Sequence, residues 1–145
     1  MQMRAADITA YKKFHKYVSL KMPEVAKVVS IVNEIQKEAG TITVATIKEA
    51  LEWGKGPTIE VTAMAEAGKF TPGTNVIKIR KLRVEQFEAG KGLVKAPNGN
   101  LVYYVGVILL HELTHWADDQ DGVDNPLEEG DEYEKAIYGG VVHAP

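Results

Sequence analysis

The stretch LHELTHWADD, residues 110–119, places two histidines four positions apart, with a glutamate directly after the first. On a helix, residues four apart lie on the same face about one turn from each other, so His111 and His115 can bind one metal ion. Glu112 lies one step further around the helix and would accept the proton of the water that such an ion activates. The spacing therefore predicts a zinc site that hydrolyses its substrate.

The surroundings of this motif have to support it, because three fixed residues occur by chance in roughly one unrelated chain of this size in a few hundred. The preceding run LVYYVGVILL, residues 101–110, predicts a helix that is buried on nearly all sides and that Asn100 can cap. Ionisable groups at the inner end of such a helix cost several kcal/mol unless they have partners. A bound metal would supply that partner.

A catalytic zinc ion usually has three protein ligands and an open position for water. The chain contains no cysteine, so the third ligand must be a histidine or a carboxylate. His143 lies beyond the next predicted helix, which starts near Pro126, and is the weaker candidate. Glu134 lies within that helix and its helical neighbours are otherwise apolar or glycine, which is typical of a buried ligand. The pattern therefore favours Glu134, whereas Glu128 falls on a solvated face of the same predicted helix.

Other polar groups near the motif could assist the reaction. Asp118 and Asp119 lie three and four residues after His115, so either could hold a ring N–H of a ligand histidine, although solvated acids at a helix end are an equal alternative. Tyr138 is the first candidate for a catalytic donor to the oxyanion that forms during hydrolysis. The further candidates for that donor are Tyr103, Tyr104 and His143.

Length and charge limit the class of protein. The chain has 145 residues, which predicts a single domain over residues 1–145. Its net charge of −3 gives no broad basic surface, so nucleic acid is not an expected partner. We find no apolar run long enough for a membrane span and no signal peptide at the start of this chain.

The first half of the chain predicts helices. Asp7 can cap a short helix, in which His15 would be a partly buried residue. Pro23 fits the first turn of a second helix, which Gly40 would end. A third helix is predicted over residues 43–53, and these helices are expected to support the strands that follow.

Two later segments alternate with the period of a β-strand. The first covers residues 58–64, and the second, NVIKIRKLRVEQF, covers residues 75–87. The alternation of the second segment shifts near Arg80 and Lys81, which predicts a bulge or a strand break there. Its outward-facing basic residues suit an exposed edge strand, and we expect the edge near residues 75–80 to hold an extended substrate.

A calcium site is a competing interpretation of the loop after the motif. The segment ADDQDGVDNPLE, residues 117–128, places Asp119, Asp121, Gly122 and Glu128 at four positions of a calcium-binding helix-loop-helix. The first ligand position is Ala117, which has no side-chain oxygen. A polar connecting loop is therefore favoured over a calcium site.

Several segments resemble known zinc peptidases. HELTH followed by a carboxylate on a second helix resembles the gluzincin type, and EKAIYGG, residues 134–140, is similar to the ligand-bearing stretch of the clostridial neurotoxin proteases. HELTHWADDQDG, residues 111–122, resembles the corresponding segment of anthrax-lethal-factor-like proteases. The whole pattern, which covers roughly residues 101–140, is most similar to the short metallopeptidase toxin domains at the C-termini of bacterial polymorphic toxins.

This resemblance implies a zinc-dependent endopeptidase that acts on a protein or peptide substrate as a bacterial toxin or effector. Such a domain would be secreted or delivered into a target cell as part of a larger toxin and paired with an immunity protein. The resemblance again selects Glu134 as the third ligand, and its Glu-Glu-Gly segment keeps Glu128 and Glu129 as alternatives that could instead orient the site.

The expected fold is α+β and zincin-like. N-terminal helices would back a small mixed sheet, and the active-site helix and a ligand helix would follow. Zinc would be bound by His111, His115 and Glu134, with Glu112 as the general base. The alternative function is a non-catalytic interaction domain in which zinc or calcium fastens two helices together.

Overall fold

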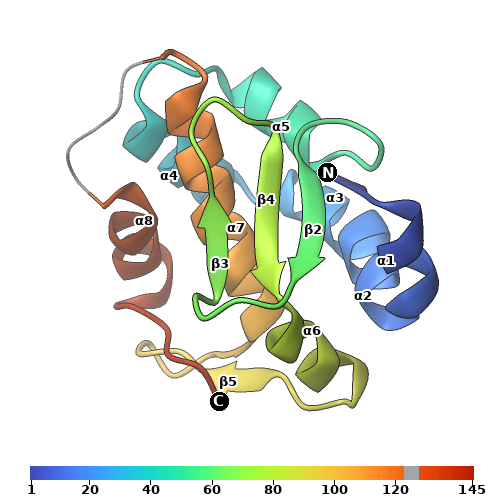
Figure 1. Cartoon of the computed structure of the whole chain (residues 1–145). Coiled ribbons are helices and arrows are strands. Elements are labelled where there is room, and N and C mark those ends of the chain that lie inside the picture. The colour runs from blue at the N-terminus through green and yellow to red at the C-terminus, as the bar shows by residue number, and fades with distance from the viewer. Residues whose placement is uncertain (123–127) are drawn as a thin grey trace.

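The computed structural model describes residues 1–122 and 128–145 and has an α+β fold with a small mixed sheet (Figure 1). Its first part is helical, as predicted, although the helices are shorter. The elements are α1 (Ala5–Ala10), α2 (Lys12–Lys16), the π-helical turn η1 (Tyr17–Lys21), α3 (Met22–Val25), α4 (Val29–Ala39) and α5 (Val44–Leu51).

The ends of these helices follow local chemistry in part. Gly40 ends α4 with φ of 85°, and the Thr43 hydroxyl caps α5 by accepting the N–H of Thr46 at 3.2 Å. The prediction that Asp7 caps a helix is wrong. Its carboxylate instead accepts hydrogen bonds from the Arg4 side chain and from the backbone N–H of Val61, and thus ties α1 to the sheet.

The main sheet has four strands in the order β1-β2-β4-β3. Strands β1 (Gln2–Met3), β2 (Thr58–Thr62) and β4 (Val76–Arg80) are parallel, and β3 (Gly68–Phe70) runs antiparallel to β4. The prediction that residues 75–80 form an edge strand is therefore wrong, because β4 is paired on both sides. The edge strand on this side of the sheet is β3, which is too short to produce an alternating pattern.

Two further predictions about this region need correction. The strand break at Arg80 is present, but the chain then forms helix α6 (Lys81–Glu88) rather than more strand. Asn100 does not cap the active-site helix, because β6 (Leu101–Tyr103) follows it and pairs with β5 (Leu93–Lys95) in a hairpin. The β-branched and aromatic residues of this segment favour the extended conformation, and Tyr103 is the N-cap of the helix.

Helix α7 (Tyr104–Asp119) carries the motif and forms the centre of the molecule. It packs against β3 and β4 on one side and against α4 and α8 (Glu129–Tyr138) on the other (Figure 1). The sheet is thus backed by α7 itself, and α4 reaches only the far side of α7. Within residues 1–122 and 128–145, no helix has the length and apolar character that crossing a membrane requires.

The turn between β3 and β4 is fastened to the end of α7. The Trp116 indole N–H donates to Asn75 Oδ1 at 2.8 Å, and the backbone N–H of Gly73 donates to Asp119 Oδ2 at 2.9 Å. These bonds hold the β3 hairpin beside the helix that carries the histidines. The edge strand is therefore positioned along the motif.

Candidate metal centre and active site

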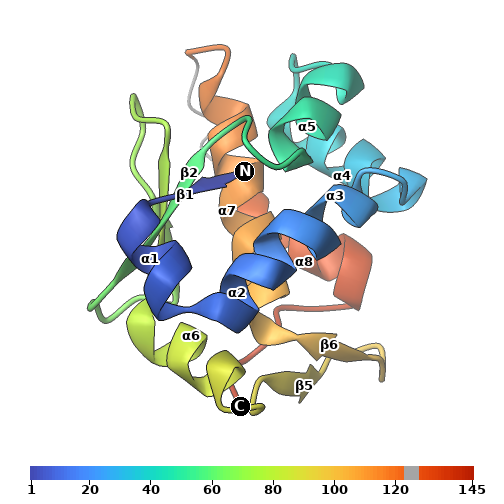
Figure 2. The ribbon, with the colours of Figure 1, turned by 90° about the vertical axis from the view of Figure 1, so that its right-hand side faces the viewer.

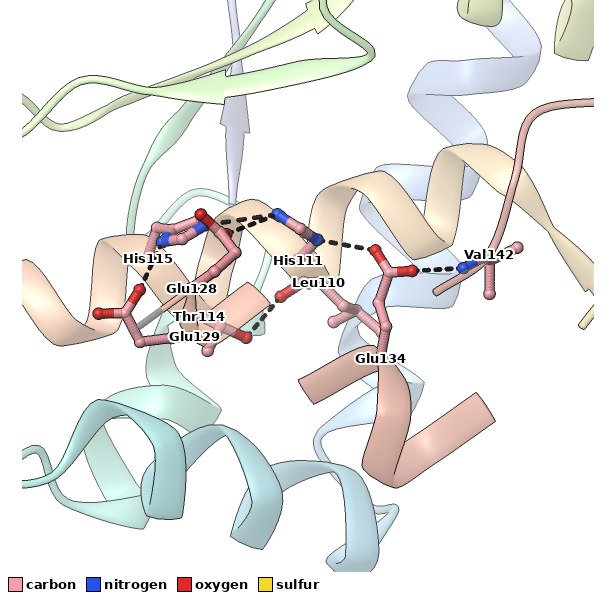
Figure 3. A network of polar contacts seen from close by, with 8 residues as sticks. All are labelled: Leu110, His111, Thr114, His115, Glu128, Glu129, Glu134 and Val142. Atoms are coloured by element: carbon pink, nitrogen blue, oxygen red, sulfur yellow. Dashed lines mark hydrogen bonds and ion pairs between the residues drawn. The ribbon is translucent and has the colours of Figure 1, made fainter. Parts of the chain in front are cut away.

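Three donor atoms meet at one point beside α7 (Figure 3). The Nε2 atoms of His111 and His115 lie 3.3 Å apart, and Glu128 Oε1 lies 3.4 Å from the first and 2.6 Å from the second. The three residues form a group that could hold a metal ion. Two nitrogens bound to a tetrahedral zinc at about 2.0–2.1 Å would be about 3.3 Å apart, so the histidine pair fits zinc.

Two buried carboxylates hold the opposite nitrogens of the same rings (Figure 3). Glu134 Oε1 lies 2.7 Å from His111 Nδ1, and Glu129 Oε2 lies 3.0 Å from His115 Nδ1. The other oxygen of Glu134 accepts the backbone N–H of Val142 at 2.6 Å. Carboxylates in this position fix the orientation of a ligand histidine and leave its Nε2 lone pair for a metal.

The carboxylates that the sequence singled out therefore contact different nitrogens of the two imidazole rings. Glu134 is buried, as its helical neighbours predict, but its carboxylate contacts the nitrogen of His111 that points away from His115. His111, Glu134 and Asp131 form a second group that could hold an ion, although it does not include His115. Glu128 is the carboxylate that faces both Nε2 atoms.

The charges around His111 favour a cation. Burial disfavours its protonated form, but the carboxylates of Glu134, Glu112 and Glu128 outweigh burial and raise the pKa of His111. Glu129 is 3% exposed, and burial together with the neighbouring Asp118 carboxyl raises its pKa. Asp118 thus contacts a carboxylate that holds a histidine, whereas Asp119 binds the β3–β4 turn.

Glu112 lies between α7 and β3 and is 7% exposed. Burial raises its pKa, whereas the two histidines and a hydrogen bond from the backbone N–H of Phe70 oppose that shift. A Cβ atom at Gly68 would lie 2.9 Å from Glu112 Cγ and 2.6 Å from Ile108 Cγ2. Only glycine therefore allows the edge strand to lie this close to Glu112.

Two cavities, of about 390 and 430 Å³, adjoin this centre, and both are lined by Gly68, His111 and Glu112. The first also contacts Glu66, Lys69 and the end of α7. The second has both polar and apolar walls, which include residues 141–144 of the C-terminal segment. The motif is therefore open to molecules on both sides of Glu112.

A family model described as metallopeptidase toxin 3 matches residues 7–139. The chain belongs to this metallopeptidase toxin family. The searches of curated proteins and of solved structures found no match. Membership implies a bound metal, and the donor group of His111, His115 and Glu128 fits that requirement.

The candidate donors to the oxyanion lie in different places in this metallopeptidase toxin domain. Tyr138 is buried, packs edge-to-face on Tyr133 with ring centroids 6.0 Å apart, and lines neither cavity beside Glu112. Tyr104 and His143 line the second cavity, and the Arg83 guanidinium lies over the Tyr104 ring at 5.7 Å. The loop that would form a calcium site includes residues 123–127, which lie outside the described residues.

Gly130 is a sequence feature whose importance becomes visible only in the structure. A Cβ atom at this position would collide with the imidazole ring of His111. We expect Gly130→Ala to displace that ring and to lower metal occupancy of the metallopeptidase toxin domain strongly. Elemental mass spectrometry of the purified variant measures this, and circular dichroism should show unchanged helix content.

A matched control for this substitution is Gly92→Ala. A Cβ atom at Gly92 would lie 3.5 Å or more from its neighbours, which is ordinary contact. This variant should keep the metal content of the wild type. Full metal occupancy in Gly130→Ala would mean that the His111 ring is not held against α8.

Proposed function

We propose that this domain is a zinc-dependent endopeptidase of the zincin-like, gluzincin-related type. His111, His115 and Glu128 are proposed to bind the zinc ion. The observation that carries the proposal is the convergence of two Nε2 atoms and one carboxylate oxygen directly beside Glu112 in an open cleft. Glu134 and Glu129 are assigned to the orientation of the two histidines.

The reaction is hydrolysis of a peptide bond. A zinc ion in this site would act as a Lewis acid that polarises the scissile carbonyl and makes water a better nucleophile. Glu112 accepts a proton from the attacking water while the water oxygen bonds to the carbonyl carbon. Glu112 then delivers this proton to the amide nitrogen as the C–N bond breaks, so that a carboxylic acid and an amine leave.

The substrate is proposed to lie extended along β3. The backbone N–H of Arg80 donates to the carbonyl of Ala67. In an antiparallel pair, every second residue directs its backbone N–H and C=O toward the neighbouring strand. The N–H and C=O groups of Gly68 and Phe70 therefore point away from β4. The Phe70 N–H contacts Glu112, whereas the groups of Gly68 have no backbone partner within residues 1–122 and 128–145 and could pair with a substrate strand. Tyr104 and His143 are the preferred candidates for a donor to the oxyanion, because both line the second cavity beside Glu112 and Tyr138 lines neither cavity.

Membership of a toxin family supports a setting for this activity. We propose that the domain is delivered into a target cell as part of a larger toxin, where it cleaves a protein. An immunity protein is the proposed partner that protects the producing cell. Neither delivery nor immunity depends on which carboxylate completes the zinc site.

The proposal is tested by metal content and protein cleavage together. Purified protein should carry one zinc ion per chain and should cleave an unfolded protein such as reduced casein. Treatment with 1,10-phenanthroline should abolish cleavage, and zinc but not calcium should restore it. A protein whose melting temperature rises with zinc but which cleaves no protein in a proteome extract would favour the non-catalytic alternative.

A further inference from the structure

An apolar groove of about 660 Å³ is lined by residues of α2, η1, α3, α6 and β6. Figure 2 shows α2, α6 and β6 on the same face of the molecule. The rings of Tyr17, Phe87 and Tyr103 meet within the groove, with centroids 5.3, 5.5 and 5.8 Å apart. Leu20 and Tyr103 are 58% and 47% exposed at its walls. None of the residues that line this groove lines the two cavities beside Glu112.

The apolar surface continues from the groove onto the β5–β6 hairpin. Leu93 is the cross-strand partner of Tyr103, and Leu101 lies two residues before Tyr103, so all three side chains lie on the same face. Leu93 and Leu101 are 51% and 69% exposed, whereas Val94 on the other face is buried. A face that meets only water would normally carry polar side chains at these positions. Contiguous exposed apolar residues of this kind mark interaction sites.

Three lysines line the same groove: Lys13, Lys16 and Lys21. None of them has an acidic partner among the ion pairs of the residues that the structure describes. The whole chain has a net charge of −3, so this is a local positive patch on an acidic protein. Its charge is complementary to carboxylates.

We propose that this groove binds a segment of a partner protein that inserts apolar side chains between the aromatic rings and presents carboxylates to the three lysines. The shape favours a protein segment over a lipid surface, because the aromatic side chains line a hollow instead of protruding. Aromatic residues that contact one another in a concave site are typical of the residues that dominate binding energy at protein interfaces. The groove lies outside the proposed active-site cleft, so its occupant and a substrate can bind together.

The position of Tyr17 decides which residues can be changed. Tyr17 begins the π-helical turn η1, and its hydroxyl packs against Gly106 of α7, the helix that carries the histidines. Replacing Tyr17 would disturb that helix and confuse loss of binding with loss of structure. The lysines and Leu20 are exposed, so changes there should leave the fold intact.

The probe is a phage library of random peptides selected on the purified chain. Selection should enrich peptides that combine apolar residues with Asp and Glu. The dissociation constant of the most enriched peptide, measured by fluorescence anisotropy, should rise at least about tenfold in Lys16→Glu/Lys21→Glu, which is about 1.4 kcal/mol. The double variant Lys48→Glu/Lys55→Glu has the same net charge on another surface and should bind like the wild type.

Leu20→Ser tests the apolar contribution separately and should also weaken binding. Val29→Ser changes a similarly exposed apolar residue on α4 and should not weaken it. Enriched peptides without acidic residues, or equal binding to both double variants, would overturn the proposal. The proposal would also be overturned if no peptide is selected and the protein sediments with phosphatidylserine vesicles in a way that depends on the lysines. The groove would then be a membrane contact. The assay needs no zinc and no cleavage, so its outcome is independent of the proposed peptidase activity.

Discussion

Replacing Glu112 with glutamine is expected to leave one zinc ion per chain and to lower kcat by about 10²- to 10⁴-fold, which is the usual contribution of a general base. Glutamine has nearly the same shape and can still accept the Phe70 N–H that holds β3 beside α7. Its amide cannot take a proton from water at neutral pH. The substitution therefore removes the proposed proton transfer and keeps the site.

The measurement combines zinc content with kcat on a peptide that the wild type cleaves. Glu66→Gln is the matched control, because Glu66 is an exposed glutamate that lines the same cavity and has no proposed role in proton transfer. It should retain kcat within about threefold, in line with the small effect of one exposed charge. A Glu112→Gln variant that cleaves as fast as this control would remove Glu112 from the mechanism.

Stability provides a second check on the same substitution. Burial raises the pKa of Glu112, which means that the folded protein disfavours its charged form. Glutamine carries no charge, so the metal-free variant should melt no lower than the metal-free wild type. Loss of activity with an unchanged Tm would then report on chemistry and not on folding.

The parts of this site that could be predicted from sequence are those set by one local element. His111, Glu112 and His115 share a helix, and the helical repeat alone brings the two imidazoles together. The burial of Glu134 also followed from its helical neighbours. A helical repeat reports which side of a helix is buried, but not which nitrogen of a neighbouring ring a carboxylate will contact.

The parts that were missed depend on contacts between distant segments. Strand β3 has three residues and includes Gly68, so no alternation marks it, yet its pairing with β4 makes it an edge strand of the sheet. Glu128 is exposed, as predicted, but the helical pattern did not predict its contact with the histidines. It is the N-cap residue of α8, where the helical repeat does not apply, and from there its side chain reaches both rings.

The choice between Glu128 and Glu134 as third ligand predicts a large difference in metal binding. Glu128→Ala would remove a donor that faces both Nε2 atoms, so the zinc affinity should fall by more than about 100-fold. Glu134→Gln should weaken zinc binding by about 10- to 100-fold, as is usual when the partner of a ligand histidine is changed. The amide cannot satisfy both the His111 ring N–H and the Val142 N–H as the carboxylate does.

Affinity alone would separate these roles poorly, so the absorption spectrum of the cobalt-substituted protein is the better measurement. The visible bands of Co²⁺ depend on the atoms bound to it. Glu134→Gln should keep the spectrum of the wild type at saturating cobalt, and Glu128→Ala should change it. Glu132→Ala is the control, because Glu132 lies on α8 but pairs with Lys135 at the surface. A spectrum that changes in Glu134→Gln and not in Glu128→Ala would make Glu134 the ligand, as the helical pattern of the sequence predicts, and would require the His111 ring to turn its Nδ1 atom toward the metal.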